Sequence, residues 1–364
     1  MTIARIAISL GLACACALAA LAAVPRGFEA HGLLYAQDDP ALLADLRLAG
    51  AFDAAIAARE IEGALAARDA DLARSLLELA RDRGIAVDPA LAQRVEAANS
   101  NSASLARAAK NFGRGLITGE PDDLAGLAGS ALGDAFVLGD IRDAAREGAR
   151  LARGEPVDQL ILGLAGVGLL ITAGSYASLG AGAPARIGVT LAKAARRTGS
   201  MTARMSEWLG RSLREVVDWA AVGRLFGSSS LTAPVLAVRA ARETIKAEKA
   251  QQLIRLAGDV GRVQAKAGTR AALDGLKIAE GPRDVARLAR LAETKGTRTR
   301  AILKTLGRGA LFLGASAMSL FSWLIAAVMT AFGFCAACKR TAERLTEYYL
   351  QRRRARRIRL VCPR

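Results

Sequence analysis

Outside three uncharged stretches, apolar residues recur at helical spacing along most of the chain, and no alternating pattern of useful length predicts a strand. Residues 70–83 are the clearest example, with charged residues on one face and apolar residues on the other. The apolar face carries Leu72, Leu76, Leu79 and Ala80. Gly84 follows where a helix is expected to end. The pattern therefore predicts an all-α protein.

Aspartate followed by proline marks two helix starts. In Asp39-Pro40 and Asp88-Pro89 a capping carboxylate precedes a proline at the first helical position. Further helices are predicted over residues 211–221, 236–257 and 284–292.

The first uncharged stretch, residues 6–24, follows a single cation, Arg5. A cationic start, an apolar run and small residues at its end are typical of a secretory signal peptide. The run is also long enough to cross a bilayer without being cleaved. Either interpretation directs the following chain outward, because the positive charge stays inside. We therefore expect a signal peptide or an N-terminal membrane anchor over residues 1–24.

The longest uncharged stretch covers residues 309–338. As a helix it would be about 45 Å long, whereas about 20 residues are enough to cross the hydrocarbon core. Trp323 falls in the middle of the stretch rather than at an end, where interfacial tryptophans gather. We predict a transmembrane helix over residues 309–338, with a fully buried core helix as the alternative.

The third uncharged stretch, residues 159–185, is ambiguous. Six glycines and several hydroxyl groups dilute it, and its continuously apolar part, residues 160–171, has the length of a buried core helix. Glycines permit close backbone approach in either setting. We interpret the stretch as part of glycine-rich apolar helical hairpins over residues 104–185. An additional transmembrane segment over residues 159–182 stays open.

The C-terminal residues 339–364 form a polybasic tail with ten Lys and Arg against two Glu. We expect its lipid-facing side chains to be Arg352, Arg353, Arg354, Arg356, Arg357 and Arg359. A short tail of this charge should remain cytoplasmic, and each cation near an anionic leaflet adds about 1 kcal/mol of attraction. The chain would then cross the inner membrane an even number of times and place residues 25–308 in the periplasm. Cations after residue 185 favour a third span instead, which would make residues 309–338 a re-entrant hairpin.

Charge divides the rest of the chain into two parts. Residues 25–158 hold 15 Lys and Arg against 22 Asp and Glu, whereas residues 186–364 hold 35 against 12. Contact with a membrane or a nucleic acid is the usual reason for such a separation. We predict an acidic helical module over residues 25–103 and a basic amphipathic helical module over residues 186–308. Nucleic acid is disfavoured as a partner, because the basic part has few aromatics, no zinc ligands and no clear helix-turn-helix.

Residues that could carry catalysis or bind a metal are scarce. His31 is the only histidine, and we interpret it as a solvated linker residue. Cys335 and Cys338 have CxxC spacing without a second pair or a histidine nearby in sequence, so helix packing or acylation is expected there. Neither GxxxxGK[ST] nor GxGxxG occurs in the expected context. We predict no catalytic residue, no metal site and no cofactor.

These patterns together predict a membrane-anchored bundle of helices and helical hairpins in the cell envelope. Its function is expected to be non-enzymatic, as a structural or interaction module. The expected partners are the membrane, through anionic lipid headgroups, and a protein that the sequence does not identify; a homo-oligomer is equally allowed. The alternative is a membrane-active protein, pore-forming, holin-like or transport-accessory, that uses the glycine-rich helices.

Overall fold

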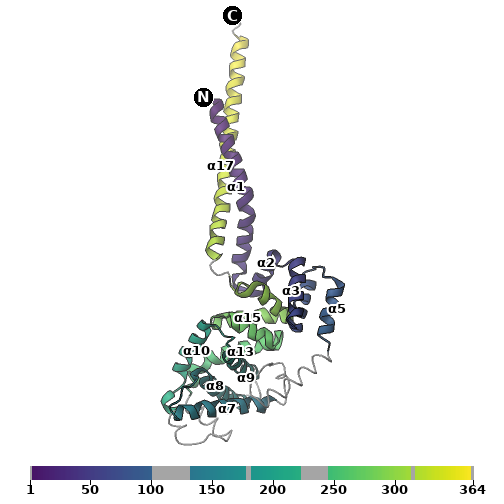
Figure 1. Ribbon diagram of the computed structural model, residues 1–364. Helices are drawn as coiled ribbons and strands as arrows, with labels where there is room; N and C mark the ends of the chain where they lie inside the picture. Colours follow the sequence, from purple (N-terminus) through teal and green to yellow (C-terminus); the bar gives the residue numbers. More distant parts are fainter. Residues whose placement is uncertain (1, 101–131, 178–181, 223–244, 313–315, 362–364) are drawn as a thin grey trace. The chain divides into compact units, whose positions relative to one another are not determined.

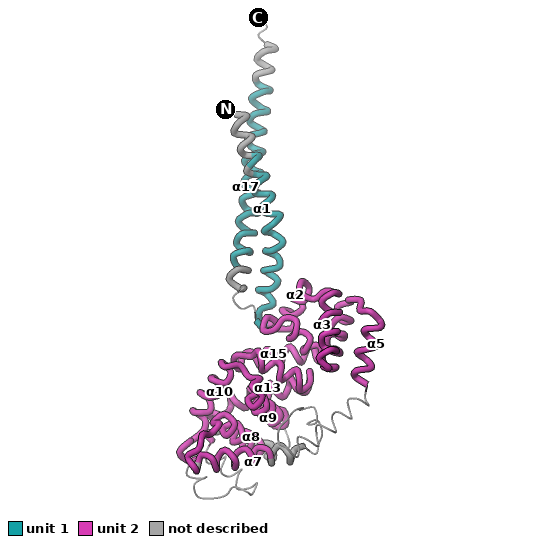
Figure 2. The backbone as a smooth tube through the Cα atoms, viewed as in Figure 1, with its two compact units in different colours: residues 1–38, 312–364 teal, residues 39–311 magenta. Residues whose placement is uncertain are grey.

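The computed structural model describes residues 2–100, 132–177, 182–222, 245–312 and 316–361 (Figure 1). In these residues it contains 14 α-helices and no strand, so the all-α prediction is confirmed for the described part of the chain. The chain forms two compact units (Figure 2). Unit 1 comprises residues 1–38 and 312–364, and unit 2 comprises residues 39–311.

Unit 1 is a pair of long helices. α1 covers Thr2–Tyr35 and ends in the 3-10 turn η1, Ala36–Asp38, while α17 covers Ser316–Val361. The two helices pack against each other and run antiparallel, so both termini of the chain lie at one end of the pair (Figure 1). α1 continues through Pro25, where the apolar run ends in the sequence.

Unit 2 is a bundle of shorter helices. Its helices are α2 (Pro40–Ala51), α3 (Ala54–Ala66), α4 (Ala70–Asp82), α5 (Pro89–Ala98), α7 (Leu132–Ala152), α8 (Gln159–Ala177), α9 (Ala183–Arg197), α10 (Ala203–Val216), α13 (Ala247–Ala267), α14 (Thr269–Ile278), α15 (Pro282–Lys295), η3 (Gly296–Arg298), α16 (Thr299–Leu306) and η4 (Gly307–Ala310).

Aspartate side chains begin the first four helices of unit 2. The predicted caps are confirmed: Asp39 accepts from the Ala41 backbone N–H at 2.9 Å, and Asp88 accepts from the Ala90 N–H at 2.9 Å. The same device, with Asp53 and Asp69, begins α3 and α4. The helix predicted over residues 70–83 is α4, and Gly84 follows it with φ +67° in the left-handed region.

α8 is a core helix of unit 2. Between Leu160 and Thr172 nearly every side chain is buried, and the helix packs against α7, α9, α10 and α13. Its apolar sequence is therefore explained by burial among other helices, as the interpretation of residues 159–185 as a buried hairpin predicts.

α9 and α13 cross at two glycines that permit backbone contact. A Cβ added to Gly188 would lie 1.8 Å from the Ala257 carbonyl oxygen, and one added to Gly261 would lie 1.9 Å from the Pro184 carbonyl oxygen. Any larger residue would push the helices apart, so these glycines set the spacing at the centre of unit 2.

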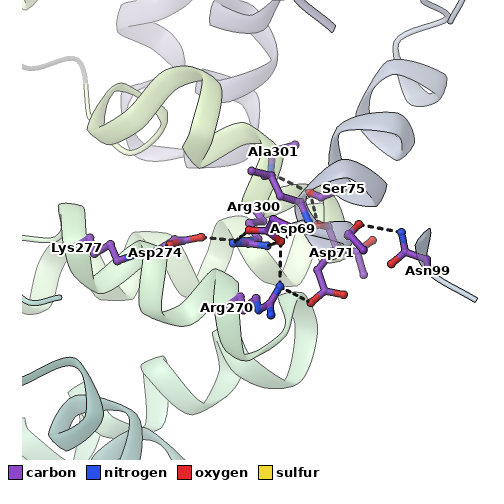
Figure 3. A network of polar contacts seen from close by, with 12 residues as sticks. Asp69, Asp71, Ser75, Asn99, Arg270, Asp274, Lys277, Arg300 and Ala301 are labelled. Atoms are coloured by element: carbon purple, nitrogen blue, oxygen red, sulfur yellow. Dashed lines mark hydrogen bonds and ion pairs between the residues drawn. The ribbon is translucent and has the colours of Figure 1, made fainter. Parts of the chain in front are cut away.

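The acidic and basic parts of the sequence bind each other within unit 2 (Figure 3). The Arg300 guanidinium donates to both oxygens of Asp69 at 2.6 Å each and to Asp274 Oδ2 at 2.8 Å. Arg270 also donates to Asp69, at 3.0 Å, and forms an ion pair with Asp71 at 3.3 Å. Burial alone would raise the pKa of Asp69, but Arg300 and Arg270 outweigh it and lower that pKa.

Two further contacts join the same parts. Lys295 Nζ lies 2.7 Å from both carboxylate oxygens of Asp45. Ser75 donates to the Thr297 carbonyl at 2.7 Å and accepts from the Ala301 N–H at 2.9 Å. Intramolecular pairing is thus one physical reason for the charge separation along the chain.

Two predicted helices have different bounds in the structure. The one expected over residues 211–221 is α10, which begins at Ala203 and ends at Val216. Val217 is extended and forms an isolated antiparallel bridge with Ile245. Of the helix expected over residues 236–257, residues 236–244 lie outside the described part of the chain, and in the rest α13 begins only at Ala247, after this bridge. The adjacent β-branched residues 216 and 217 favour this extended backbone. The helix predicted over residues 284–292 is confirmed as part of α15.

The uncharged stretch 309–338 is divided between the two units. Ala310 and Leu311 are fully buried in unit 2, where Arg47 and Arg287 donate to the carbonyls of Gly309 and Leu311 at 2.9 Å each. Residues 309–311 of the predicted span therefore belong to unit 2, where arginine side chains hold them by donating to their carbonyls, and not to α17. Residues 104–131 of the predicted glycine-rich hairpins lie outside the described residues.

Candidate functional site: the apolar helix pair

Small side chains line the contact between α1 and α17. On α1 the buried positions are Ala13, Ala23, Gly27 and Ala30, and the half-buried ones include Cys16, Ala20 and Val24. On α17 the buried positions are Ala327, Ala337 and Thr341, and the half-buried ones include Leu324, Thr330 and Gly333. The threonine hydroxyls donate to carbonyls of their own helix, so they leave no unpaired polar group in the contact.

Three contacts define the register of the pair. A Cβ added to Gly27 would lie 2.5 Å from Ala327 Cβ, and one added to Gly333 would lie 3.7 Å from Cys16 Sγ. The Arg26 guanidinium lies 4.7 Å from the centre of the Trp323 ring. The two helices are therefore in close contact at Gly27 and Gly333. Arg26, just after the apolar run of α1, lies beside Trp323 of α17.

Large apolar side chains point away from this contact. Leu18, Leu21 and Phe28 on α1 are 69%, 73% and 73% exposed, and Phe332 on α17 is 74% exposed. Phe321, Ile325, Val328 and Met329 of α17 are also exposed. The fully buried residues of the pair are thus small, and most of its large apolar side chains are exposed.

Two helical segments are long and apolar enough to cross a membrane: Ala13–Asp38 and Phe321–Arg354. A signal sequence and a soluble core helix pass the same test of length and composition. The second segment begins later than the stretch predicted from the sequence. Trp323, expected in the middle of the span, lies instead seven residues after the start of α17 and stacks on Arg26, as an interfacial tryptophan can.

The arginines of the predicted tail continue α17 as one helix to Val361. Arg352, Arg353 and Arg354 are exposed, and Arg356, Arg357 and Arg359 occupy the following turns. Arg352 lies 5.7 Å from the centre of the Tyr348 ring. This end of α17 extends beyond the start of α1 (Figure 1), and all six predicted residues lie in the last ten residues of α17.

His31 and four of the five cysteines lie in the described residues. His31 is exposed near the end of α1, so it belongs to a helix and not to a linker. Cys14, Cys335 and Cys338 are exposed, Cys16 is half-buried, and all four are free thiols. Within the described residues, no group of three or more His, Cys, Asp and Glu side chains could hold a metal ion.

Sequence reasoning missed a buried ion cluster in unit 2. Lys193 of α9 donates to Asp140 Oδ1 at 2.5 Å and to Asp143 Oδ2 at 2.7 Å, and Arg197 donates to Asp143 Oδ1 at 2.5 Å. The lysine and both aspartates are at most 5% exposed. Only the i, i+3 spacing of the two aspartates on α7 could have suggested a shared partner.

The pKa values of the two aspartates shift in opposite directions. Burial raises the pKa of Asp140 despite Lys193. Burial would also raise the pKa of Asp143, but Lys193 and Arg197 together outweigh it and lower that pKa. The cluster can hold α7 against α9, and its charges are satisfied by one another.

No protein-family model matches the chain, and no curated protein or solved structure is detectably similar to it. Its function must therefore be inferred from its own residues.

Proposed function

We propose that the protein is a non-enzymatic module of the cell envelope, anchored in the inner membrane by α1 and α17. Unit 2 is the interaction body on the periplasmic side, and the arginine tail binds anionic lipid headgroups on the cytoplasmic side.

The observation that carries this proposal is that the contact between α1 and α17 buries small residues and leaves most large apolar residues exposed. In water a two-helix hairpin gains stability by burying its largest apolar side chains. Helices in lipid gain nothing from doing so, and they associate through small residues that allow close backbone contact. The fully buried residues of the contact between α1 and α17 are Ala, Gly and Thr, and exposed Leu and Phe side chains lie outside it, so the pair follows the second pattern.

The antiparallel pair supports an even number of crossings. Both termini lie at one end of the pair, so residues 39–311, which connect the two helices, leave it at the other end. The ten cations after residue 338 favour the cytoplasm for the termini. Unit 2 then belongs to the periplasm. The burial of α8 in unit 2 favours this proposal over a pore-forming role or a third span, because either would need this apolar segment in contact with lipid.

Reporter fusions test this topology. Alkaline phosphatase inserted after residue 100 or 220 is expected to be active, and after residue 360 inactive, because the enzyme folds only outside the cytoplasm. Green fluorescent protein at the same positions serves as the control and should give the inverse pattern. Activity at 100 but not at 220 would favour a crossing by residues 159–185, and activity at 360 would overturn the proposal.

Trypsin tests the lipid contact of the tail. The full-length protein is placed in nanodiscs of neutral lipid or with about a third anionic lipid, where the tail attraction is about 1 kcal/mol per cation. Cleavage after Arg352–Arg354 should be slowed about tenfold or more by the anionic lipid at low salt, and the effect should shrink as salt screens it. Cleavage after the exposed Arg142 of unit 2 is the internal control. Equal tail cleavage in both lipids would contradict headgroup binding.

A further inference from the structure

The contacts between α1 and α17 fix which residues of the two helices lie level with one another. In an antiparallel pair the numbers of facing residues have a nearly constant sum, and the contacts of Gly27, Gly333 and Arg26 put that sum at about 350. Residues 6–24, the uncharged run of α1, therefore lie beside about residues 326–344 of α17. The uncharged part of α17, however, covers residues 316–338.

The two apolar runs are consequently displaced along the pair. They overlap over only about 13 residues, or about 20 Å, whereas the hydrocarbon core of a bilayer is about 30 Å thick. Lys339, Arg340 and Glu343 lie beside the uncharged run of α1, and Arg26 and Glu29 lie beside the uncharged run of α17. Charged side chains are costly in hydrocarbon, so this register fits a bilayer of ordinary thickness poorly.

A displacement of seven residues makes the two runs level. Residues 6–24 then lie beside about residues 319–337, Arg5 lies near Lys339, and Arg26 lies near the start of α17. The shared apolar length becomes about 19 residues, or about 28 Å, which matches the hydrocarbon core.

The contact tolerates this displacement because its small residues repeat every seven positions. Ala20 and Gly27 on α1 are seven residues apart, and so are Thr330 and Ala337 on α17. A slide of one heptad keeps the same face of each helix in the contact and places Ala20 against Ala327, where Gly27 lies in the structure. The helices separate slightly at that point to accept the methyl group of Ala20, since a Cβ at position 27 would lie 2.5 Å from Ala327 Cβ.

We propose that a bilayer of ordinary thickness holds α1 and α17 in a second register, displaced by seven residues from the one in the structure, and that a thinner bilayer favours the register of the structure. Each register matches a different hydrocarbon thickness, and a slide of about 10 Å separates them. This inference rests on the proposed anchoring of the protein by α1 and α17, for which it names bilayer thickness as the variable that selects the register.

Disulfide crosslinking of the full-length protein in nanodiscs distinguishes the two registers. The five native cysteines are replaced by alanine, and Ala327→Cys is combined with either Gly27→Cys or Ala20→Cys. Positions 20 and 27 are about 10 Å apart along α1, whereas a disulfide requires Cα atoms within about 7 Å, so each register favours one of the two crosslinks. After brief oxidation, proteolysis without reduction and mass spectrometry quantify each crosslink.

In discs of dioleoyl phosphatidylcholine the Ala20→Cys protein should form at least about ten times more crosslink than the Gly27→Cys protein. The reason is that the cost of a charged side chain in hydrocarbon exceeds a tenfold change in an equilibrium. In discs of dilauroyl phosphatidylcholine, whose hydrocarbon core is thinner, this ratio should fall by about threefold or more. Leu21→Cys with Ala327→Cys is the matched control: Leu21 is next to Ala20 but 73% exposed, so it should crosslink poorly in both lipids.

A main crosslink at position 27 in dioleoyl discs, equal ratios in the two lipids, or no crosslink at either position would each overturn the inference. These outcomes do not depend on topology, since discs have no cytoplasmic side. Reporter fusions that are active at residue 360 would refute the proposed orientation while leaving the measured register intact. A mature protein that begins after residue 24 would refute the two-helix anchor and the inference together.

Discussion

Lys193→Met is expected to destabilise unit 2 by about 3–5 kcal/mol at neutral pH, because it leaves two buried carboxylates without their shared cation. Lys193 Nζ lies 2.5 Å from Asp140 and 2.7 Å from Asp143, and methionine preserves the volume of the side chain while removing the charge. Chemical unfolding of the full-length protein in micelles, followed by circular dichroism, measures the change. Lys277→Met is the control, since its pair with Asp274 is 3.1 Å long but half exposed, and should cost less than about 1 kcal/mol.

The defect of Lys193→Met should shrink at acid pH. In the native protein the lowered pKa of Asp143 contributes stability that is present above the ordinary carboxyl pKa and lost as pH falls through the lowered value. The raised pKa of Asp140 acts in the opposite sense, because its charged form is disfavoured by burial as pH rises through the raised value. Without the lysine both carboxyls would take up protons more readily, so the variant should approach the native protein between pH 7 and pH 5. A defect of the same size at both pH values would contradict this account.

Gly188→Ala and Gly261→Ala are expected to destabilise unit 2 by about 3 kcal/mol or more each, since both overpack a helix crossing against rigid backbone. The added Cβ atoms would lie 1.8 Å and 1.9 Å from carbonyl oxygens, so α9 and α13 must separate. The shift in the denaturation midpoint of the full-length protein measures the effect.

Gly258→Ala is the control on the same helix. A Cβ at Gly258 meets no atom within 4 Å, so alanine should stabilise α13 by about 0.5–1 kcal/mol through its higher helix propensity. If Gly188→Ala behaved like Gly258→Ala, the close crossing of α9 and α13 would be wrong.

Local signals in the sequence predicted the starts of several helices. Asp39 and Asp88 were readable as caps because a cap involves only neighbouring residues, and the face of α4 was readable from its period. The break at Val217 was not readable, since it depends on pairing with Ile245, which lies 28 residues further along the chain. Residues 309–311 were predicted to be part of a membrane span because they are uncharged. The sequence does not show that Arg47 and Arg287, which are distant along the chain or on another helix, donate to the carbonyls of Gly309 and Leu311.

The candidate site was predicted in part. The arginines at the end of α17 are evident from composition alone. The contact between α1 and α17 is not evident from composition, because alanine and glycine are scattered throughout this chain. Only the register of α1 against α17 selects Ala23, Gly27 and Ala327 as buried positions. The buried ion cluster was missed entirely, since Lys193 meets Asp140 and Asp143 only through the packing of α9 on α7.

The amino-acid sequence by itself determined that this protein is helical, that its ends carry long apolar segments, and that a dense positive charge closes the chain. These properties follow from periodicity, length and charge, which neighbouring residues define together. Only the tertiary structure decided that α8 is a core helix, that acidic and basic parts neutralise each other in unit 2, and that α1 and α17 join through their smallest side chains. Burial, ion pairing and close packing each need two segments to meet, and which segments meet depends on the free energy of the whole fold.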